Sequence, residues 1–333
     1  MKAAPTLDGV LVEWGERLFY PRTHISKASP LPRVGLSTSR RAAVIRARIA
    51  TTVTRRAPQV MVKVTGGGRG MGAIAAHFRY ISKNGRLAIE DDRGVVSDGK
   101  DAVPDLVEQW RYDGSLIEEV SHRREAFNIM LSMPAGTQPR FVQMAVREFA
   151  QVELAGHRWV MVLHEHQTNP HVHLSVRAES MTGERLNPRK TDLHRWRETF
   201  AEKLRGLGID AEATRQVTRG QNRNYEALWR LKAKEEGRLH VSRPVAKSGA
   251  RHTASRNDAT IAWAHIMKAL ANSDAASDRQ LAEDIKEFMI QLPHVKDALR
   301  LRQRQVAPTR DHTIERAPQP GVTKRRPDPE IER

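Results

Sequence analysis

The densest chemical signal in the sequence is a group of histidines. His164, His166, His171 and His173 are four of the 14 histidines in the chain and fall within ten residues. Residues 171–178 read HVHLSVRA, an alternation of polar and apolar residues that predicts a half-buried strand. His171 and His173 then share one face while the apolar residues take the other. Two imidazoles at this spacing are placed as metal ligands require.

A third imidazole can join this pair. Residues 158–164 form an apolar run that predicts a buried strand ending at His164, and the turn at 167–170 allows it to pair with the next strand. Three histidines leave coordination positions open, which is typical of catalytic metal sites. The alternative is a chance cluster of surface histidines in a basic protein. Imidazoles alone would also suit zinc or nickel.

Tyr80 is the candidate nucleophile. It lies on a predicted helix, residues 71–82, and is flanked by the cations Arg79, Lys83 and Arg86. A helical tyrosine taken alone is usually a packing residue of an amphipathic helix. Its interest here is that a metal site of this type needs a nucleophile.

The glycine-rich segment before this helix has two interpretations. Gly68, Gly70 and Ala73 match the G-x-G-x-x-A fingerprint of dinucleotide sites, with acidic residues about twenty positions on. No series of strand–helix units follows, which argues against that class of enzyme. We therefore favour backbone amides that, together with Arg69, contact a phosphate of bound nucleic acid.

Composition supports a polyanionic partner. The 333 residues include 56 lysines and arginines against 39 acidic residues, a net charge of +17. Such a field attracts nucleic acid or an anionic membrane surface. The absence of cysteine excludes disulfides, thiolate catalysis and iron–sulfur clusters. No segment reaches the about 18 apolar residues of a membrane helix, and the N-terminus lacks the apolar stretch of a signal peptide.

Strands and helices are mixed without regular alternation, which favours an α+β fold. The predicted strands are 60–64, 125–131, 158–164 and 171–178, and the main predicted helices are 71–82, 139–154 and 192–206. Residues 86–104 are polar and predict a loop. Four regions follow: a basic, partly disordered N-terminal arm at 1–58, a nuclease core at 59–215, a helical region at 216–295, and a disordered basic tail at 296–333. The arm carries a net charge of +8 and is expected to contact nucleic acid; the alternative is a solvated tail.

Three blocks, in order, resemble one known family. They are VKVTGGGRGMGAIAAHFRYISKNGRL around Tyr80, NIMLSMPAGTQP around Ser132, and VMVLHEHQTNPHVHLSVRAE around the histidines. Over about residues 59–215 the chain resembles the conjugative relaxases and mobilisation nucleases, which include the T-DNA border endonucleases and belong to the HUH single-strand nucleases. One position departs from the family pattern, because His166 stands where the family commonly has an aspartate.

The resemblance implies both a fold and an activity. The fold is a central antiparallel sheet of about five strands flanked by helices. The activity is site- and strand-specific nicking of single-stranded DNA, with Tyr80 forming a covalent 5′-phosphotyrosine and Ser132 touching DNA beside the nick. A divalent metal, magnesium or manganese, is held by His164, His171 and His173. His166 is the candidate base for the tyrosine proton, with Glu165 or Glu148 as acidic substitutes.

Partners and surroundings follow from the same resemblance. Cations expected to contact DNA are Arg69, Arg79, Lys83, Arg86 and Arg177, the last because it shares the strand face of the histidines. Expected partners are the transfer origin, accessory relaxosome proteins and a type IV coupling protein, for which the basic sequence at 324–327 could be a signal. The expected location is the cytoplasm, with export alongside the DNA as an extension. The alternatives are a non-catalytic single-strand-binding protein of the same fold and, less favoured, a dinucleotide-dependent enzyme.

Overall fold

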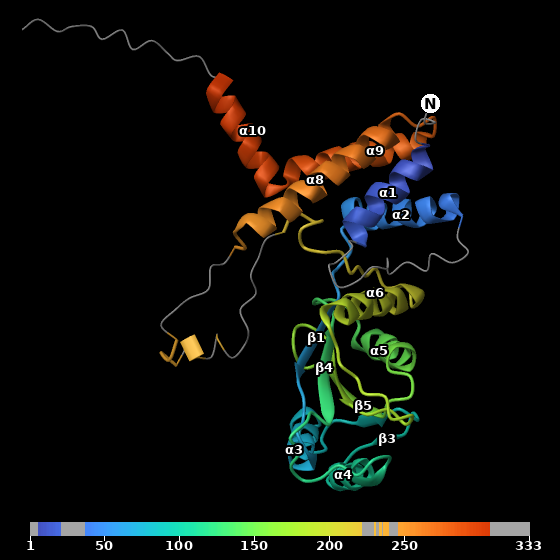
Figure 1. Cartoon of the computed structure of the whole chain (residues 1–333), viewed down its shortest axis with the longest axis vertical. Helices are drawn as coiled ribbons and strands as arrows, with labels where there is room; N and C mark the ends of the chain where they lie inside the picture. Colours follow the sequence, from blue (N-terminus) through green and yellow to red (C-terminus); the bar gives the residue numbers. More distant parts are fainter. Residues whose placement is uncertain are drawn as a thin grey trace, which may run out of the picture. The chain divides into compact units, whose positions relative to one another are not determined.

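The structure is a computed structural model that describes residues 6–20, 37–221, 230, 233–234, 236–239 and 246–306. The chain divides into two compact units, Met1–Leu292 and Pro293–Arg333. The first unit contains a β-sheet covered by helices and a group of helices contributed by both ends of the unit (Figure 1).

Six strands of the described residues form a single sheet in which every neighbouring pair is antiparallel. The strand order is β1-β4-β6-β5-β2-β3. The strands are β1 (Met61–Gly66), β2 (Ile89–Asp91), β3 (Val96–Ser97), β4 (Ala126–Ser132), β5 (Trp159–His164) and β6 (His171–Arg177). The expected α+β class with a central antiparallel sheet is confirmed, with six strands in place of about five.

The two short strands β2 and β3 lie in the segment that we expected to be a loop. Glu90 of β2 is buried, and its carboxylate accepts hydrogen bonds from Arg147 and Gln143 of helix α5 (Pro139–Glu153). A strand this short and acidic shows no alternation, and its partner arginine lies far away in the sequence. Local pattern therefore could not predict it.

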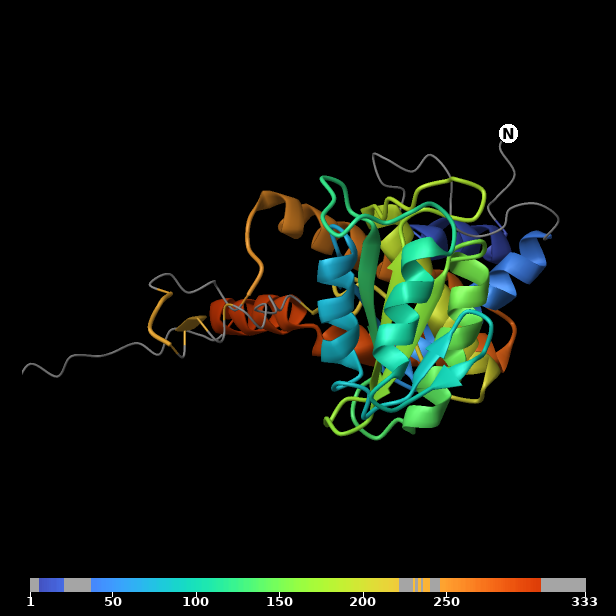
Figure 2. The same ribbon diagram turned by 90° about the horizontal axis from the view of Figure 1, so that it is seen from below.

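Helices cover both faces of the sheet. On one face, α5 and α6 (Lys190–Gly206) pack against an apolar core that includes Leu131, Met161 and Leu174. On the other face, α3 (Met71–Ile81) and α4 (Ala102–Tyr112) lie side by side (Figures 1 and 2) and form a second core with Val160 and Val162 of β5. Val172, Leu174 and Val176 of β6 belong to the core on the α5 side. Because side chains alternate along a strand, the β6 residues between them point toward the α3 side.

Helix α3 is fixed at both ends. Gly70 precedes it with φ +98°, and a Cβ atom there would lie 2.3 Å from the carbonyl oxygen of Glu119, so only glycine fits. At the other end the Ser82 hydroxyl donates to the Phe78 carbonyl, and Lys83 and Asn84 adopt positive φ, which stops the helix. Tyr80 therefore lies in the last turn.

Two stretches of the N-terminal segment, which we expected to be a basic and partly disordered arm, form helices that are packed into the fold. Helices α1 (Leu7–Phe19) and α2 (Thr38–Val53) share one apolar core with α8 (Ala250–Ala271) and α9 (Ala276–Gln291). Ile45 and Trp263 are fully buried in that core. The expected boundaries at 58 and 216 thus separate helices that pack together.

Part of the positive charge of this segment is paired inside the fold. Four of its arginines form ion pairs with acidic residues, most of them distant in the sequence: Arg41 with Glu16, Arg46 with Asp8 and Asp278, Arg48 with Glu198 and Glu212, and Arg55 with Asp210. Paired guanidinium groups contribute less to DNA attraction than free ones. DNA contact by this segment stays a prediction that rests on its other cations, of which Lys2, Arg22, Lys27 and Arg33 lie outside the described residues.

The part of the expected disordered tail that the structure describes, residues 296–306, is helical. Pro293 follows helix α9 and opens helix α10 (Pro293–Val306). Proline suits this first position because its fixed φ is helical and the N–H it lacks would have no helical partner. Residues 307–333, with the basic sequence at 324–327, lie outside the described residues. Across the described residues, no helix has the length and apolarity needed to cross a membrane.

Arg48 offers a test of how the helices are joined to the sheet. Its side chain is 7% exposed, and removing it leaves Glu198 and Glu212 without this cation in a buried site. Arg48→Met is expected to lower the free energy of unfolding by about 3 kcal/mol. Arg40→Met changes an exposed arginine of the same helix and is expected to cost less than about 0.5 kcal/mol. Urea denaturation measures both, and equal stabilities would contradict this role for Arg48.

Candidate active site

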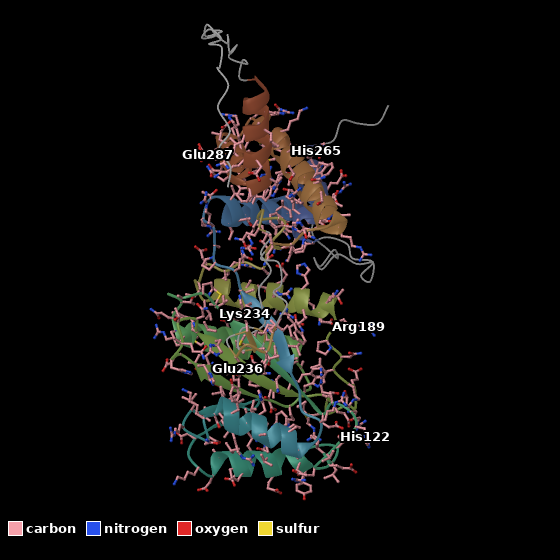
Figure 3. All side chains as sticks on the ribbon, turned by 90° about the vertical axis from the view of Figure 1, so that its left-hand side faces the viewer. His122, Arg189, Lys234, Glu236, His265 and Glu287 are labelled. Atoms are coloured by element: carbon pink, nitrogen blue, oxygen red, sulfur yellow. The ribbon has the colours of Figure 1, made fainter. Side chains whose placement is uncertain are left out.

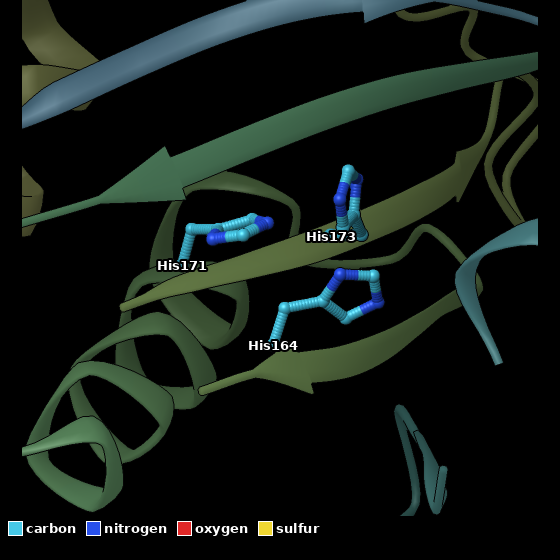
Figure 4. Close-up of side chains that lie close together, drawn as sticks. All are labelled: His164, His171 and His173. Atoms are coloured by element: carbon cyan, nitrogen blue, oxygen red, sulfur yellow. The ribbon is translucent and has the colours of Figure 1, made fainter. Parts of the chain in front are cut away.

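Three histidines converge on the α3 side of the sheet. The β5–β6 register pairs His164 directly with His171, and His173 lies two residues further along β6 (Figure 4). One ring nitrogen from each of the three lies within 4.8 Å of the others. The predicted cluster is therefore assembled by strand pairing across the turn at 167–170.

Two of the three imidazoles are oriented by backbone carbonyls. His164 Nε2 lies 2.7 Å from the carbonyl oxygen of Ile81, the last residue of α3, and His171 Nδ1 lies 3.0 Å from that of Asn169. A carbonyl only accepts, so each of these nitrogens carries the proton. The other nitrogen of each ring, Nδ1 of His164 and Nε2 of His171, is then left with a lone pair. Such outer contacts are typical of metal-binding histidines.

Burial keeps two of the three imidazoles uncharged. Desolvation lowers the pKa of His173 to about 3, with a further contribution from the neighbouring His164 and His171. Desolvation also lowers the pKa of His164. Both imidazoles are therefore neutral at pH 7, the form that binds a metal.

The donor set fits a divalent cation. Three nitrogen donors on one face leave positions for oxygen ligands from water or a phosphate. Nitrogen donors alone are compatible with zinc or nickel as well as with the manganese or magnesium that the resemblance implies. The three histidines are the residues that would hold the ion.

Tyr80 lies beside this cluster. Its ring centroid is 6.3 Å from that of His173, and the side chain is 70% exposed. Ile81, which follows it, accepts the hydrogen bond from His164. The nucleophile predicted from the sequence is thus accessible and adjacent to the predicted metal ligands.

His77 is a site residue that the sequence argument did not select. It lies one helical turn before Tyr80, with ring centroids 6.2 Å from Tyr80 and 6.4 Å from His173. Burial lowers its pKa to about 4. The three-residue spacing places His77 and Tyr80 on one helix face, which the sequence shows. No local pattern in the sequence indicates that this face lies beside His173 of the sheet.

Ser132 and His166 occupy different environments around the cluster. Ser132 is paired with His171 in the β4–β6 register and is buried, and its hydroxyl donates to the carbonyl of Pro170 at 3.2 Å. This geometry steadies the turn before His171 and does not present the hydroxyl to DNA. His166 is exposed, with its ring centroid 5.2 Å from that of His164.

Residues 80–209 match the family model described as relaxase, MobA/VirD2-like, nuclease domain. This segment is similar to the nuclease domain of relaxases. The match begins at Tyr80 and includes Ser132 and all three clustered histidines, in agreement with the family predicted from the motifs. No curated protein matches the chain.

The cations expected to bind DNA divide into two groups. Arg79, Lys83 and Arg86 are exposed near the end of α3 that carries Tyr80. Arg69 is also exposed but precedes the opposite end of this 11-residue helix, about 15 Å away along the axis. Only the first group lies next to Tyr80, the nucleophile predicted from the sequence.

The glycine-rich turn is not an open phosphate site. The N–H groups of Gly68, Met71 and Gly72 donate to the carbonyls of Ala126, Glu118 and Glu119. Amides committed in this way are not free to bind a phosphate, whether of DNA or of a dinucleotide. The phosphate contact expected for this turn is therefore wrong for these amides.

Arg177 is also placed differently from its prediction. It is 2% exposed, and its guanidinium donates to the carbonyls of Trp110, Asp113 and Ser115 at the end of α4. It shares the strand face of the histidines, as predicted, but α4 covers that end of the strand. Arg177 therefore holds α4 in place and is not available to DNA.

Metal binding to the protein tests the histidine cluster. His173→Ala is expected to weaken Mn²⁺ binding by more than about 100-fold. Loss of an outer-shell partner costs up to about 100-fold, and loss of a direct ligand should cost more. His122→Ala, which changes an exposed histidine (Figure 3), is the matched control. Calorimetric titration measures both. Equal affinities for the two variants would exclude His173 as a ligand.

The lowered pKa values predict how stability depends on pH. Unfolding returns His77 and His173 to ordinary pKa values near 6.5, so the unfolded chain binds more protons below that pH. The metal-free protein should lose stability as the pH falls from 6.5 toward 4, by at most about 1.4 kcal/mol per pH unit for each histidine. The double variant His77→Gln/His173→Gln should have a flatter profile in urea denaturation between pH 7 and pH 5. A profile as steep as that of the wild type would contradict this assignment.

Proposed function

We propose that this relaxase domain is a site- and strand-specific DNA nickase that forms a covalent intermediate through Tyr80. The observation that carries the proposal is the position of an exposed tyrosine 6.3 Å, between ring centroids, from a histidine of a three-imidazole cluster. Tyr80 also follows from the family motif. The other described tyrosines are Tyr20, which is buried, and Tyr112 on α4.

The proposed reaction exchanges one phosphodiester for another. The phenol oxygen of Tyr80 attacks the scissile phosphorus, the 3′ oxygen leaves, and the 5′ phosphate remains on the tyrosine. The phenol proton passes to a base, for which exposed His166 is the proposed residue, and a proton is returned to the 3′ oxygen. The step is nearly isoenergetic, so the nick can be resealed without ATP.

The surrounding charges suit this chemistry. Phenol has an ordinary pKa near 10, so Tyr80 needs a positive environment to ionise. Arg79, Lys83 and Arg86 are exposed around it and would attract the phosphates on either side of the nick. A divalent metal held by the three histidines would offset charge on the scissile phosphate.

The proposed setting is the start of conjugative or mobilisation transfer. The substrate is single-stranded DNA at a transfer origin, acted on in the cytoplasm with accessory relaxosome proteins. A type IV coupling protein is the proposed receiver of the covalent complex. The family resemblance supports these partners.

The covalent adduct tests the proposal directly. A pool of randomised single-stranded oligonucleotides with Mn²⁺ is expected to yield a protein–DNA adduct that survives denaturing electrophoresis. Tyr80→Phe should reduce it by at least about a thousandfold, because phenylalanine has no oxygen with which to form the ester.

Tyr112→Phe is the matched control, because it changes a tyrosine of the described residues that is 66% exposed on a neighbouring helix. It should leave the adduct unchanged. An adduct that persists in Tyr80→Phe would move the nucleophile elsewhere. No adduct with the wild type would favour the binding-only alternative.

A further inference from the structure

The proposed nucleophile has no anchor of its own in the described structure. Tyr80 is 70% exposed, and its phenol oxygen makes no hydrogen bond to the described residues. An exposed side chain samples several rotamers. In-line attack on phosphorus requires one of them to be held, because misplaced reacting groups lose much of the rate that orientation provides.

His77 is positioned to supply that anchor. It precedes Tyr80 by three residues on α3, a spacing that brings side chains together on one helix face. Its ring is next to both Tyr80 and His173: the three ring centroids lie 6.2, 6.4 and 6.3 Å from one another.

His77 also lacks a partner. Its Nε2 atom is buried, and among the described residues it has no hydrogen bond. Buried polar atoms are nearly always satisfied, and an unsatisfied one calls for an explanation. An imidazole N–H donates a hydrogen bond, and the oxygen of a tyrosine can accept one while its own proton goes elsewhere.

We propose that His77 is a positioning residue whose Nε2–H donates a hydrogen bond to the Tyr80 oxygen and holds the phenol over the histidine cluster for attack, which leaves the hydroxyl proton for His166. This inference rests on the proposed nucleophile. It gives His77 no role as a metal ligand, since the converging nitrogen donors come from His164, His171 and His173 without it. It also explains why the two side chains share one face of α3.

The test compares His77→Phe with His77→Gln in the full-length protein. Phenylalanine keeps a ring in the site without an N–H donor, whereas glutamine keeps an N–H donor. The substrate is the best-cleaved oligonucleotide captured from the randomised pool, with Mn²⁺. His77→Phe is expected to slow adduct formation at saturating oligonucleotide by about 10- to 100-fold, the range that loss of one hydrogen bond to a reacting group supports. His77→Gln should recover most of that loss.

Three further measurements separate this role from others. KM for the oligonucleotide, Mn²⁺ affinity and thermal stability should be unchanged in His77→Phe. A raised KM with an unchanged maximal rate would make His77 a DNA contact, and weakened Mn²⁺ binding would make it a ligand; either overturns the proposal. So would a rate within twofold of the wild type, or equal losses in His77→Phe and His77→Gln.

Tyr80→Phe is measured in parallel, so that failure of the proposed nucleophile can be distinguished from failure of the positioning role of His77. If its adduct persists, or if the wild type forms none, the proposed nucleophile fails and the role of His77 fails with it. If Tyr80→Phe is inactive while His77→Phe reacts normally, only the positioning role is overturned.

Discussion

The hydrogen bond from His164 Nε2 to the carbonyl oxygen of Ile81 joins the histidine cluster to the helix of the proposed nucleophile. For the helix, it satisfies one of the terminal carbonyls that have no partner within a helix. For the histidine, it fixes which ring nitrogen carries the proton and leaves the other for a metal. Because Ile81 follows Tyr80 directly, the same bond sets where the tyrosine stands relative to β5 and β6.

That bond depends on a rigid sheet beneath it. The His164–His171 register is held by strands whose opposite face is packed against α5 and α6. The Glu90–Arg147 pair ties the β2 edge to α5. The net charge of +17 is therefore not one uniform field. Four arginines of the N-terminal segment form internal ion pairs. Arg79, Lys83 and Arg86, near Tyr80, are exposed and available to a polyanion.

Sequence reasoning succeeded where the information was local. Strict alternation in residues 171–178 placed His171 and His173 on one face, and helical periodicity found α3, α5 and α6. It failed for Arg177 because alternation gives the face of a strand and not what covers each position along it. It failed for the N-terminal helices because the acidic partners of Arg46 and Arg48 include residues more than 140 positions away.

The account's central claim is that Tyr80 becomes covalently bonded to DNA. The most direct measurement is tandem mass spectrometry of the denatured protein–DNA adduct after digestion with nuclease and trypsin. Trypsin cuts after Arg79 and Lys83, so the account predicts a nucleotide on the four-residue peptide that begins with Tyr80. A nucleotide found instead on Tyr112 or on a histidine would contradict it.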